Sequence, residues 1–252
     1  MHRFFVPAEA LRGDPILLTG DIAHQMRRVL RLRPGEVVQL LDGAGSCHEA
    51  KVMSVAEGGV QLQPIRQLVA EGEPSTKITL FQAVLKGDRF DWALQKGTEI
   101  GASRFVPMIC QRSVRADPAD VQRKHDRWQR IIQEAAEQSG RAVIPALEHV
   151  RHFAQAVLPD PPESSDPANP LRVLLWEAEN ALGLRAGLRG SNFRCGSRIQ
   201  LYVGPEGGFS ADEVALARSH GVLPVTLGKR ILRSETAGLV AATLVLCEAG
   251  EL

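Results

Sequence analysis

The first part of the chain, up to residue 72, alternates short apolar runs with glycine-rich turns. The apolar runs lie at residues 3–6, 37–41, 50–55 and 60–65, and glycines separate them at residues 42–45 and 57–59. Short runs between such turns are typical of β-strands. This segment therefore predicts a small barrel-like β-domain with one helical insertion at residues 22–32. The polar stretch 69–75 (VAEGEPS) is expected to be a linker, which gives predicted domains at 1–72 and 76–252.

Beyond the linker, the pattern changes to alternating strands and helices. Ser210 and Glu213 form a capping-box sequence, so a helix is expected from there to about His220. The alternation predicts an α/β domain with a mainly parallel sheet. The proline-rich segment 159–170 is expected to be an exposed loop. Strands are predicted at 78–85, 105–110, 171–176, 199–203 and 222–227, and helices at 89–100, 119–139, 210–220 and 236–249.

The last predicted helix is apolar on every side over residues 237–247. A helix with this composition in a soluble protein must be covered all round. It is either a central core helix or a helix that a second subunit covers in part, and its small residues would allow close helix packing.

Composition and charge limit the classes of function. The chain has 252 residues, 44% of them hydrophobic, and a net charge of +1, so a polyanionic partner would have to be bound by a local basic patch. Four cysteines lie far apart, which predicts free thiols in a cytoplasmic protein and no zinc site. The N-terminus lacks the apolar core of a signal peptide, and no run is long enough to cross a membrane.

Two loops near the end of the chain follow predicted strands directly, at 204–209 (GPEGGF) and 228–236 (GKRILRSET). Ligands of parallel sheets bind beyond the carboxyl ends of the strands, and glycines there let the backbone approach a ligand closely. Neither the phosphate-loop motif of nucleotide triphosphatases nor a dinucleotide-binding glycine motif is present. Taken alone, GPEGG is equally compatible with a simple strand-to-helix turn.

Taken together, the segments GPEGGFS (204–210) and LGKRILRSETA (227–237) resemble the signature of the SPOUT methyltransferases. Within that superfamily the chain resembles the RsmE family, the 16S ribosomal RNA (uracil-N3)-methyltransferases, over nearly its whole length. The likeness includes HQMRRVLR (24–31), QKGTEIG (95–101), Arg112-Ser113-Val114 and EAAEQSGR (134–141). Gly97, Ile100 and Lys229 depart from the usual pattern without removing an expected functional group.

The resemblance implies a trefoil-knotted α/β domain that binds S-adenosylmethionine in the knot, a homodimer with the site near the interface, and a PUA-like domain that binds RNA. The implied reaction is methylation of N3 of a uridine near the 3′ end of 16S ribosomal RNA in the small subunit. No metal is implied. The implied cofactor-binding residues are Leu175, Gly204, Glu206, Gly207, Gly208, Leu227, Gly228, Ile231 and Leu232. The alternative for the apolar members is core packing.

Arg233 and Glu235 are the expected catalytic residues. Uracil N3 carries a weakly acidic proton, so a carboxylate within hydrogen-bond reach would serve to remove it. An arginine beside the ring oxygens would stabilise the negative charge that develops there. The alternatives are an ion pair between Arg233 and Glu235, or a helix-capping role for Glu235.

Contact with RNA is expected from a basic stretch that has no acidic residue over 22–35. A basic cluster is otherwise most often a solvated surface, and Gln95, Lys96 and Glu99 would equally well only support their helix. The expected RNA-binding residues are His24, Arg27, Arg28, Arg31 and Arg33, with Arg112, Gln138 and Arg141.

Three other functions compete with this one. They are a non-catalytic RNA-binding assembly factor, a SPOUT enzyme with another RNA target, and an unrelated small-molecule α/β enzyme. Intact glycine loops argue against the first, and the basic stretch argues against the third.

Overall fold

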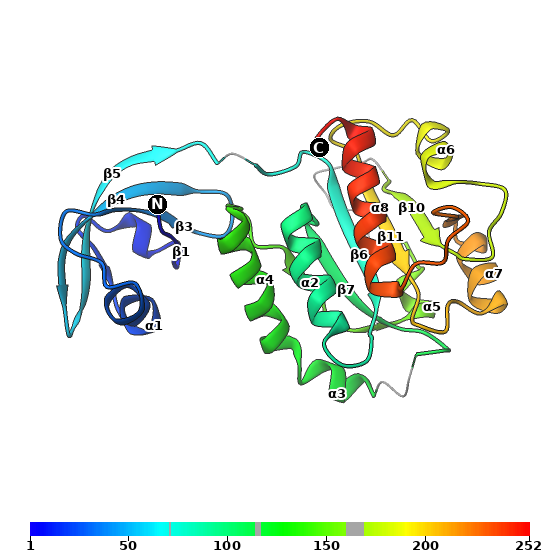
Figure 1. Ribbon diagram of the computed structural model, residues 1–252, viewed down its shortest axis with the longest axis horizontal. Coiled ribbons are helices and arrows are strands. Elements are labelled where there is room, and N and C mark those ends of the chain that lie inside the picture. Colours follow the sequence, from blue (N-terminus) through cyan, green and yellow to red (C-terminus); the bar gives the residue numbers. More distant parts are fainter. Residues whose placement is uncertain (71, 114–116, 160–168) are drawn as a thin grey trace. The chain divides into compact units, whose positions relative to one another are not determined.

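The computed structural model describes residues 1–70, 72–113, 117–159 and 169–252 (Figure 1). The chain divides into two compact units. The first contains Met1–Glu73 together with Ala136–Ile144, and the second contains Pro74–Ala135 together with Pro145–Leu252. The predicted loop at 159–170 lies mostly outside the described residues, as does residue 114 of the Arg112–Val114 motif.

The first unit is built on a five-stranded sheet in the order β1-β3-β4-β5-β2. Strands β1 and β3 run parallel, and the other neighbouring pairs are antiparallel. All four predicted strands are present, whereas β2 was not predicted. The elements are β1 (Arg3–Phe5), η1 (Ala10–Arg12), β2 (Ile16–Leu18), α1 (Gly20–His24), the π-helical turn η2 (Gln25–Val29), β3 (Val37–Leu41), β4 (Cys47–Ala56) and β5 (Gly59–Leu68).

The packing of the core shows that the five-stranded sheet of this unit is curved. Side chains from all five strands, such as Phe4, Ile16 and Val60, meet in one cluster around Met26 of the helical insertion. Strands at opposite edges of a flat sheet could not contact a common centre, so the sheet must curl around the insertion.

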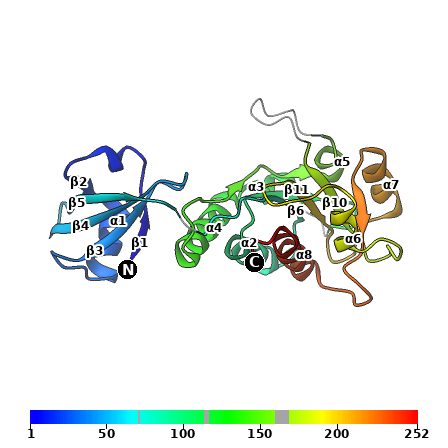
Figure 2. The ribbon, with the colours of Figure 1, turned by 90° about the horizontal axis from the view of Figure 1, so that it is seen from above.

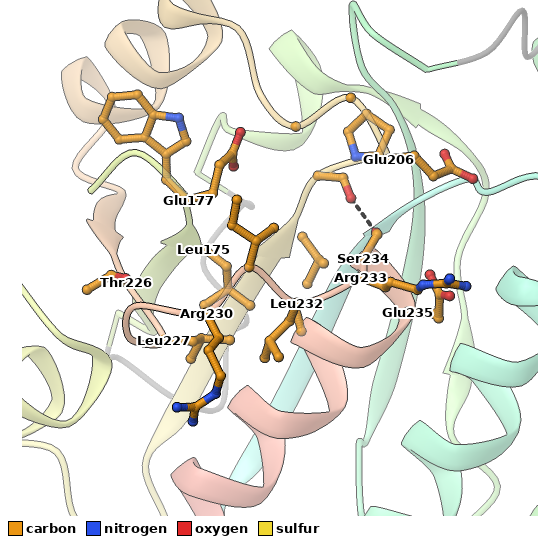
Figure 3. Close-up of a pocket in the computed structure, with 18 of the residues that line it drawn as sticks. Leu175, Glu177, Glu206, Thr226, Leu227, Arg230, Leu232, Arg233, Ser234 and Glu235 are labelled. Atoms are coloured by element: carbon orange, nitrogen blue, oxygen red, sulfur yellow. Dashed lines mark hydrogen bonds between the residues drawn. The ribbon is translucent and has the colours of Figure 1, made fainter. Parts of the chain in front are cut away.

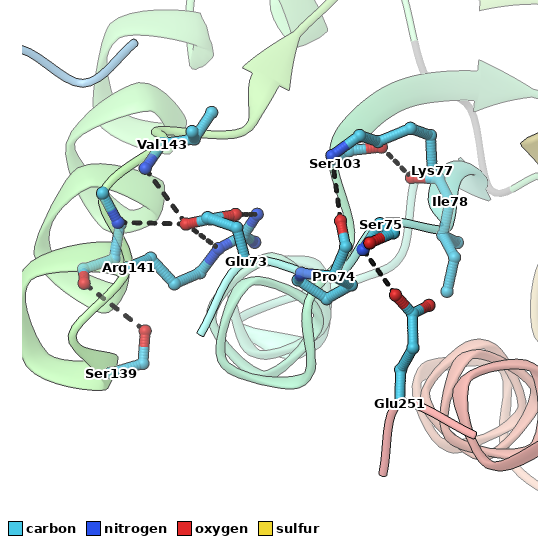
Figure 4. Close-up of polar contacts among 12 residues, drawn as sticks. Glu73, Pro74, Ser75, Lys77, Ile78, Ser103, Ser139, Arg141, Val143 and Glu251 are labelled. Atoms are coloured by element: carbon cyan, nitrogen blue, oxygen red, sulfur yellow. Dashed lines mark hydrogen bonds and ion pairs between the residues drawn. The ribbon is translucent and has the colours of Figure 1, made fainter. Parts of the chain in front are cut away.

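The half-buried carboxylate of Glu73 ties residues 136–144 to the rest of the first unit. Glu73 accepts hydrogen bonds from the backbone amides of Ala142 (3.0 Å) and Val143 (3.1 Å) and from Arg141 Nη2 (2.8 Å), as Figure 4 shows. Burial raises the pKa of Glu73, but the hydrogen bonds and charge of Arg141 lower it more, so the pKa lies below its usual value. The sequence had not indicated that this segment joins the first unit.

The second unit contains a seven-stranded sheet in the order β12-β10-β11-β6-β7-β8, with β9 also paired to β7. Every recorded strand pair in this sheet is parallel, which confirms the predicted α/β architecture. The strands are β6 (Lys77–Ala83), β7 (Arg104–Ile109), β8 (Ala146–Leu147), β9 (Arg151–His152), β10 (Leu171–Leu175), β11 (Arg198–Val203) and β12 (Leu223–Val225).

The helices of this unit follow the prediction in part. The helices α2 and α7 agree with it, and Ser210 and Glu213 form the predicted capping box of α7. The predicted helix at 119–139 is instead two helices, with a turn at residues 123–124, and the short helices α5 and α6 were missed. The helices are α2 (Arg89–Ile100), α3 (Pro118–Gln122), α4 (His125–Ser139), α5 (Phe153–Ala156), α6 (Leu184–Arg189), α7 (Ala211–Ser219) and α8 (Ser234–Ala249).

Helices cover both faces of the sheet (Figure 2). On β6, Phe81 and Ala83 pack with Phe153 of α5 and Val214 of α7. Leu80 and Gln82, which alternate with them, lie against Gly238 of α8. This two-residue alternation places the apolar side chains of one strand in two separate layers.

After the edge strand β12 the chain returns past β10 and enters α8, which packs on β11 and β6. The predicted knot depends on this return path. The same path brings the loop between β12 and α8 beside the loop that follows β11.

Helix α8 is not covered all round by its own chain. Leu244 is 42% exposed, and Cys247 is exposed as well. The four cysteines are free thiols, as predicted. Among the helices of the described residues, none has both the length and the apolar character that a membrane crossing requires.

Candidate functional site

A cavity of about 660 Å³ opens where the loops after β10, β11 and β12 meet (Figure 3). This volume falls within the usual range for a small-molecule or cofactor site. All nine expected cofactor-binding residues and both expected catalytic residues line it. They are joined by Arg89, Trp176, Glu177, Asn180, Val203, Pro205, Thr226, Lys229, Arg230, Ser234 and Ala237.

The cavity has two ends of different character. Figure 3 shows Leu175, Thr226 and Leu227 on the left of the view, and Glu206, Ser234 and Glu235 on the right. The left side combines the leucines with the Thr226 hydroxyl, the Glu177 carboxylate and Arg230, whereas Glu206, Arg233, Ser234 and Glu235 gather on the right, which we call the polar end. Such a shape suits an elongated ligand with a flat part at one end and a polar reacting part at the other.

Close packing fixes the glycines of the GPEGG loop. Gly208 has φ +68°, and a Cβ at this position would collide with the Glu177 carboxylate. A Cβ on Gly207 would lie 3.2 Å from Arg112 Cβ, and Arg112 Nη1 donates a hydrogen bond to the Gly207 carbonyl (3.0 Å). The loop is thus held from behind by Arg112, while its backbone faces the cavity.

The loop before α8 presents free backbone donors. Gly228 has φ +113°, a conformation that favours glycine, and its amide donates to Thr226 Oγ1 (3.1 Å). Within the described part of the chain, the amides of Leu227, Ile231 and Leu232 donate to no protein acceptor. Unpaired donors beside a cavity are suited to hydrogen bonding with a ligand.

Ser234 connects the two loops. Its Oγ donates to the Gly204 carbonyl and accepts from Gln82 Nε2 (3.0 Å), and all three residues are buried. The first turn of α8 is therefore fixed to the GPEGG loop and to the carboxyl end of β6. This contact holds the two neighbouring residues, Arg233 and Glu235, at the polar end of the cavity.

Glu235 is only 8% exposed, and its Oε2 has no hydrogen-bond partner among the described residues. Its other oxygen lies 3.9 Å from Arg89 Nε. The nearest cation is thus Arg89 of α2, and the ion pair with Arg233 considered from the sequence is not among the recorded contacts of the described residues. A buried carboxylate oxygen without a donor is costly, so a ligand that supplies an N–H would relieve that cost.

Arg233 and Glu206 are both exposed side chains at this end. Arg233 is the residue that precedes α8. Glu206 accepts hydrogen bonds from the Lys86 amide (3.3 Å) and from Arg89 Nη1 (3.2 Å). Its carboxylate is therefore engaged with α2 and the loop before it, which leaves its backbone as the part that faces a ligand.

The expected RNA-binding residues of the first unit form an exposed basic group. His24, Arg28, Arg31 and Arg33 are exposed, and Arg31 has φ +54°, which is unusual for a residue other than glycine. Arg27 is half-buried and donates to the Ala56 carbonyl (3.4 Å). The structure thus leaves at least four cationic or titratable side chains of this group open to solvent.

Of the three remaining expected RNA contacts, Arg141 needs correction. Its side chain is 5% exposed and is engaged by Glu73, so it stabilises the first unit and does not reach a ligand at the surface. Gln138 is exposed on α4, and Arg112 is exposed while it holds Gly207.

The sequence did not single out Arg89, Ser234, Gln82 or Glu177. Gln82 had one visible signal, a polar residue inside the apolar strand ITLFQAVL. Ser234 also had a signal, its position between the two expected catalytic residues, Arg233 and Glu235. Arg89 and Glu177 had no local signal, because their partners lie far away along the chain.

Comparison with known proteins agrees with this architecture. Residues 72–246 match the family model described as an RNA methyltransferase domain, and residues 18–65 match an RNA methyltransferase PUA domain. The class is therefore that of the RNA methyltransferases, and the expected fold class, a SPOUT domain preceded by a small PUA-like β-domain, is confirmed.

Individual relatives narrow this class. The Synechocystis ribosomal RNA small subunit methyltransferase E is 36% identical over 95% of this chain and 75% of its own length. The Bacillus subtilis protein of the same name is 31% identical over 97% and 96%. A crystal structure of the Neisseria gonorrhoeae protein of that name, bound to S-adenosyl methionine, has a TM-score of 0.84 at 30% identity, over 98% of this chain and 97% of that one. This chain belongs to the ribosomal RNA small subunit methyltransferase E family.

Proposed function

We propose that this protein uses S-adenosylmethionine to methylate N3 of a uridine near the 3′ end of 16S ribosomal RNA. The observation that carries the proposal is the cavity formed by the three loops, with Arg233 and Glu235 at its polar end. The Neisseria relative binds S-adenosyl methionine, and the curated relatives are named as small subunit ribosomal RNA methyltransferases.

The residues of the cavity fit such a cofactor. Away from the polar end, the cavity offers Leu175 and Leu227 for the flat purine, and the free amides of Ile231 and Leu232 suit its polar edge. Gly204, Gly207 and Gly208 keep side chains away from the wall of the loop, where a Cβ would crowd its neighbours. When bound, the cofactor supplies an electrophilic methyl group on a sulfonium.

The chemistry assigned to this chain is removal of one proton and stabilisation of charge. Glu235 accepts the N3 proton through the oxygen that has no partner in the described chain. Arg233 carries a guanidinium that stabilises negative charge on the uracil oxygens. Holding the nitrogen in line with the methyl group contributes about 7–11 kcal/mol, more than the roughly 3–5 kcal/mol of one general base.

We assign RNA binding to the PUA-like domain, residues 1–72, and methyl transfer to residues 76–252. His24, Arg28, Arg31 and Arg33 are exposed and suited to phosphate contacts, and Arg27 lies beside them. Gln138 and Arg112 add polar contacts from the rest of the chain.

The proposed assembly is a homodimer that acts on the small ribosomal subunit in the cytoplasm. The exposed face of α8, with Leu244 and Cys247, would be covered by the second copy. This accounts for a helix that is apolar on every side although its own chain covers only part of it. Light scattering coupled to gel filtration should give a mass of two chains, and a single-chain mass at micromolar concentration would contradict this.

Two measurements test the function. Titration calorimetry should detect S-adenosylmethionine binding, and Gly208→Val should abolish it because a β-branched residue cannot hold the φ of +68° without distorting the loop. Mass spectrometry of ribosomal RNA from cells that lack the protein should show the loss of one N3-methyluridine near the 3′ end of 16S RNA. An unchanged methylation pattern would refute the assignment.

A further inference from the structure

A second cavity of about 570 Å³ lies beside the first. Its walls are the loop from Lys86 to Asp88, the first turn of α2 with Arg89 and Trp92, and the first turn of α8. Arg89 and Glu235 line both cavities. Two adjoining spaces are therefore separated by a carboxylate and a guanidinium, and all of these residues belong to the second unit.

The chemistry of the second cavity differs from that of the first. Trp92 lines this cavity and is 43% exposed, so part of this large aromatic residue is accessible to a ligand. Lys86 brings an exposed cationic side chain and Asp88 a carboxylate. Arg89 is already paired with Glu206, and its Nε lies 3.9 Å from Glu235 Oε1. Glu235, more than nine-tenths buried, has an oxygen without a donor among the described residues.

These features select a ligand class. A stacking surface, the ammonium group of Lys86 for a phosphate and a carboxylate that requires an N–H together match a nucleotide whose base has a ring N–H. A pyrimidine such as uracil has this N–H between two carbonyl groups. A base turned out of its RNA stack would thus present N3 to Glu235 while its face rests on the indole.

We propose that the second cavity is the pocket for the target uridine and that Trp92 is its stacking platform. This inference rests on the proposed function and extends it to the acceptor nucleotide. Glu235 would then lie between donor and acceptor, at the point where the N3 proton leaves. Trp92 binds and orients the base and takes no part in proton transfer.

Trp92 variants test the proposal through methyl-transfer kinetics on small ribosomal subunits from cells that lack the protein. Trp92→Ala should lower kcat/KM by about 5- to 150-fold, the effect of losing one base–aromatic stack. Trp92→Phe should keep most of the activity, because a phenyl ring also stacks. Leu158→Ala serves as a control, since Leu158 is 48% exposed and lines neither cavity.

Crosslinking gives a readout that does not depend on methyl transfer. Ribosomal RNA transcribed with 5-iodouridine should, on irradiation, crosslink to the peptide that carries Trp92. Calorimetry with S-adenosylmethionine on the same variants reports the first cavity alone and should give unchanged affinities.

Each result decides the matter. Full activity of Trp92→Ala, or equal loss in Trp92→Phe and Trp92→Ala, would overturn the stacking role. Crosslinks confined to other peptides would do the same. A shift of Trp92→Ala to a single-chain mass would show that a second copy covers this cavity, which also overturns the proposal. Failure of the wild-type protein to bind S-adenosylmethionine would refute the proposed function, whereas a crosslink at Trp92 would still identify the nucleotide pocket.

Discussion

Replacing Glu235 with glutamine tests the proposed proton acceptor with little change in shape. The amide keeps the size of the carboxylate but carries no negative charge and cannot take the N3 proton. A single general base typically contributes 10²–10⁴-fold, or about 3–5 kcal/mol of the activation barrier. Positioning, worth about 7–11 kcal/mol, should survive because Ser234 still holds the first turn of α8. We therefore expect kcat to fall by about 10²–10⁴-fold while activity stays measurable.

The assay is single-turnover methyl transfer followed over a range of pH. Below the pKa of the uracil, the rate of Glu235→Gln should rise about tenfold per pH unit, because the nitrogen must then lose its proton to solvent. The wild-type rate should depend less on pH. Affinity for S-adenosylmethionine should be unchanged, since glutamine keeps the size of the side chain and the proposed role of Glu235 concerns the acceptor.

Glu206→Gln is the matched control. Its carboxylate contacts the same Arg89 but is exposed at the rim, so it should change kcat only slightly. Loss of more than about 10⁵-fold in Glu235→Gln, with folding and cofactor affinity intact, would mean that the barrier depends on the carboxylate more than on positioning. A rate within threefold of wild type would remove Glu235 as the proton acceptor.

Three further predictions concern the supports of the site and the RNA surface. Ser234→Ala leaves the Gly204 carbonyl without its buried donor, so urea unfolding should show a loss of about 1–3 kcal/mol, and an unchanged midpoint would contradict the connecting role. Glu73→Gln should lower the free energy of unfolding by about 3–5 kcal/mol at pH 7, because it leaves the buried charge of Arg141 without its anionic partner. In the wild-type protein, the contribution of Glu73 to the free energy of unfolding is present above the pKa of its unfolded state, about 4.3, and is lost as pH falls through the lower pKa of the folded state. The difference in urea midpoint between the two proteins should therefore disappear in acid. Arg27→Ala with Arg28→Ala should flatten the salt dependence of RNA binding by about 0.7–0.9 per lost phosphate contact, and an unchanged slope would exclude both residues from the RNA surface.

Local patterns predicted the fold well where the structure is decided locally. The capping box at Ser210 and Glu213 involves residues three apart, and it begins α7 as expected. The helix predicted at 119–139 failed because helical composition continues through residues 123–124, where the chain makes a turn. The strand β2 and the helices α5 and α6 are short, so each offers too few residues for a periodic signal.

The site, like the fold, was predicted where the signal lies within a short stretch of sequence and was missed where it depends on distant residues. The two glycine-rich loops were visible because each follows a strand whose carboxyl end must lie at the ligand-binding edge of the sheet. The contacts that hold them were not visible, because Ser234 and Gln82 are 152 residues apart in the sequence. Arg141 was misassigned for the same reason, since its partner Glu73 lies 68 residues away and nothing nearby shows that the guanidinium is buried.

The position of the chemistry at the start of α8 has an electrostatic consequence. The N-terminal end of a helix carries about half a positive charge, and its effect is confined to the first turn. Glu235 lies in that turn, so the partial positive charge of the helix end lies close to the proposed proton acceptor. Arg233 stands immediately before the helix, so in the proposed mechanism its charge adds to that of the helix end where negative charge would develop on the uracil oxygens. Because Ser234 fixes this turn to the GPEGG loop and to the carboxyl end of β6, these charges need not be reoriented during the reaction. A variant that loosens the turn, such as Ser234→Ala, should therefore lower kcat more than it weakens cofactor binding, and the reverse order would indicate that the turn serves the cofactor alone.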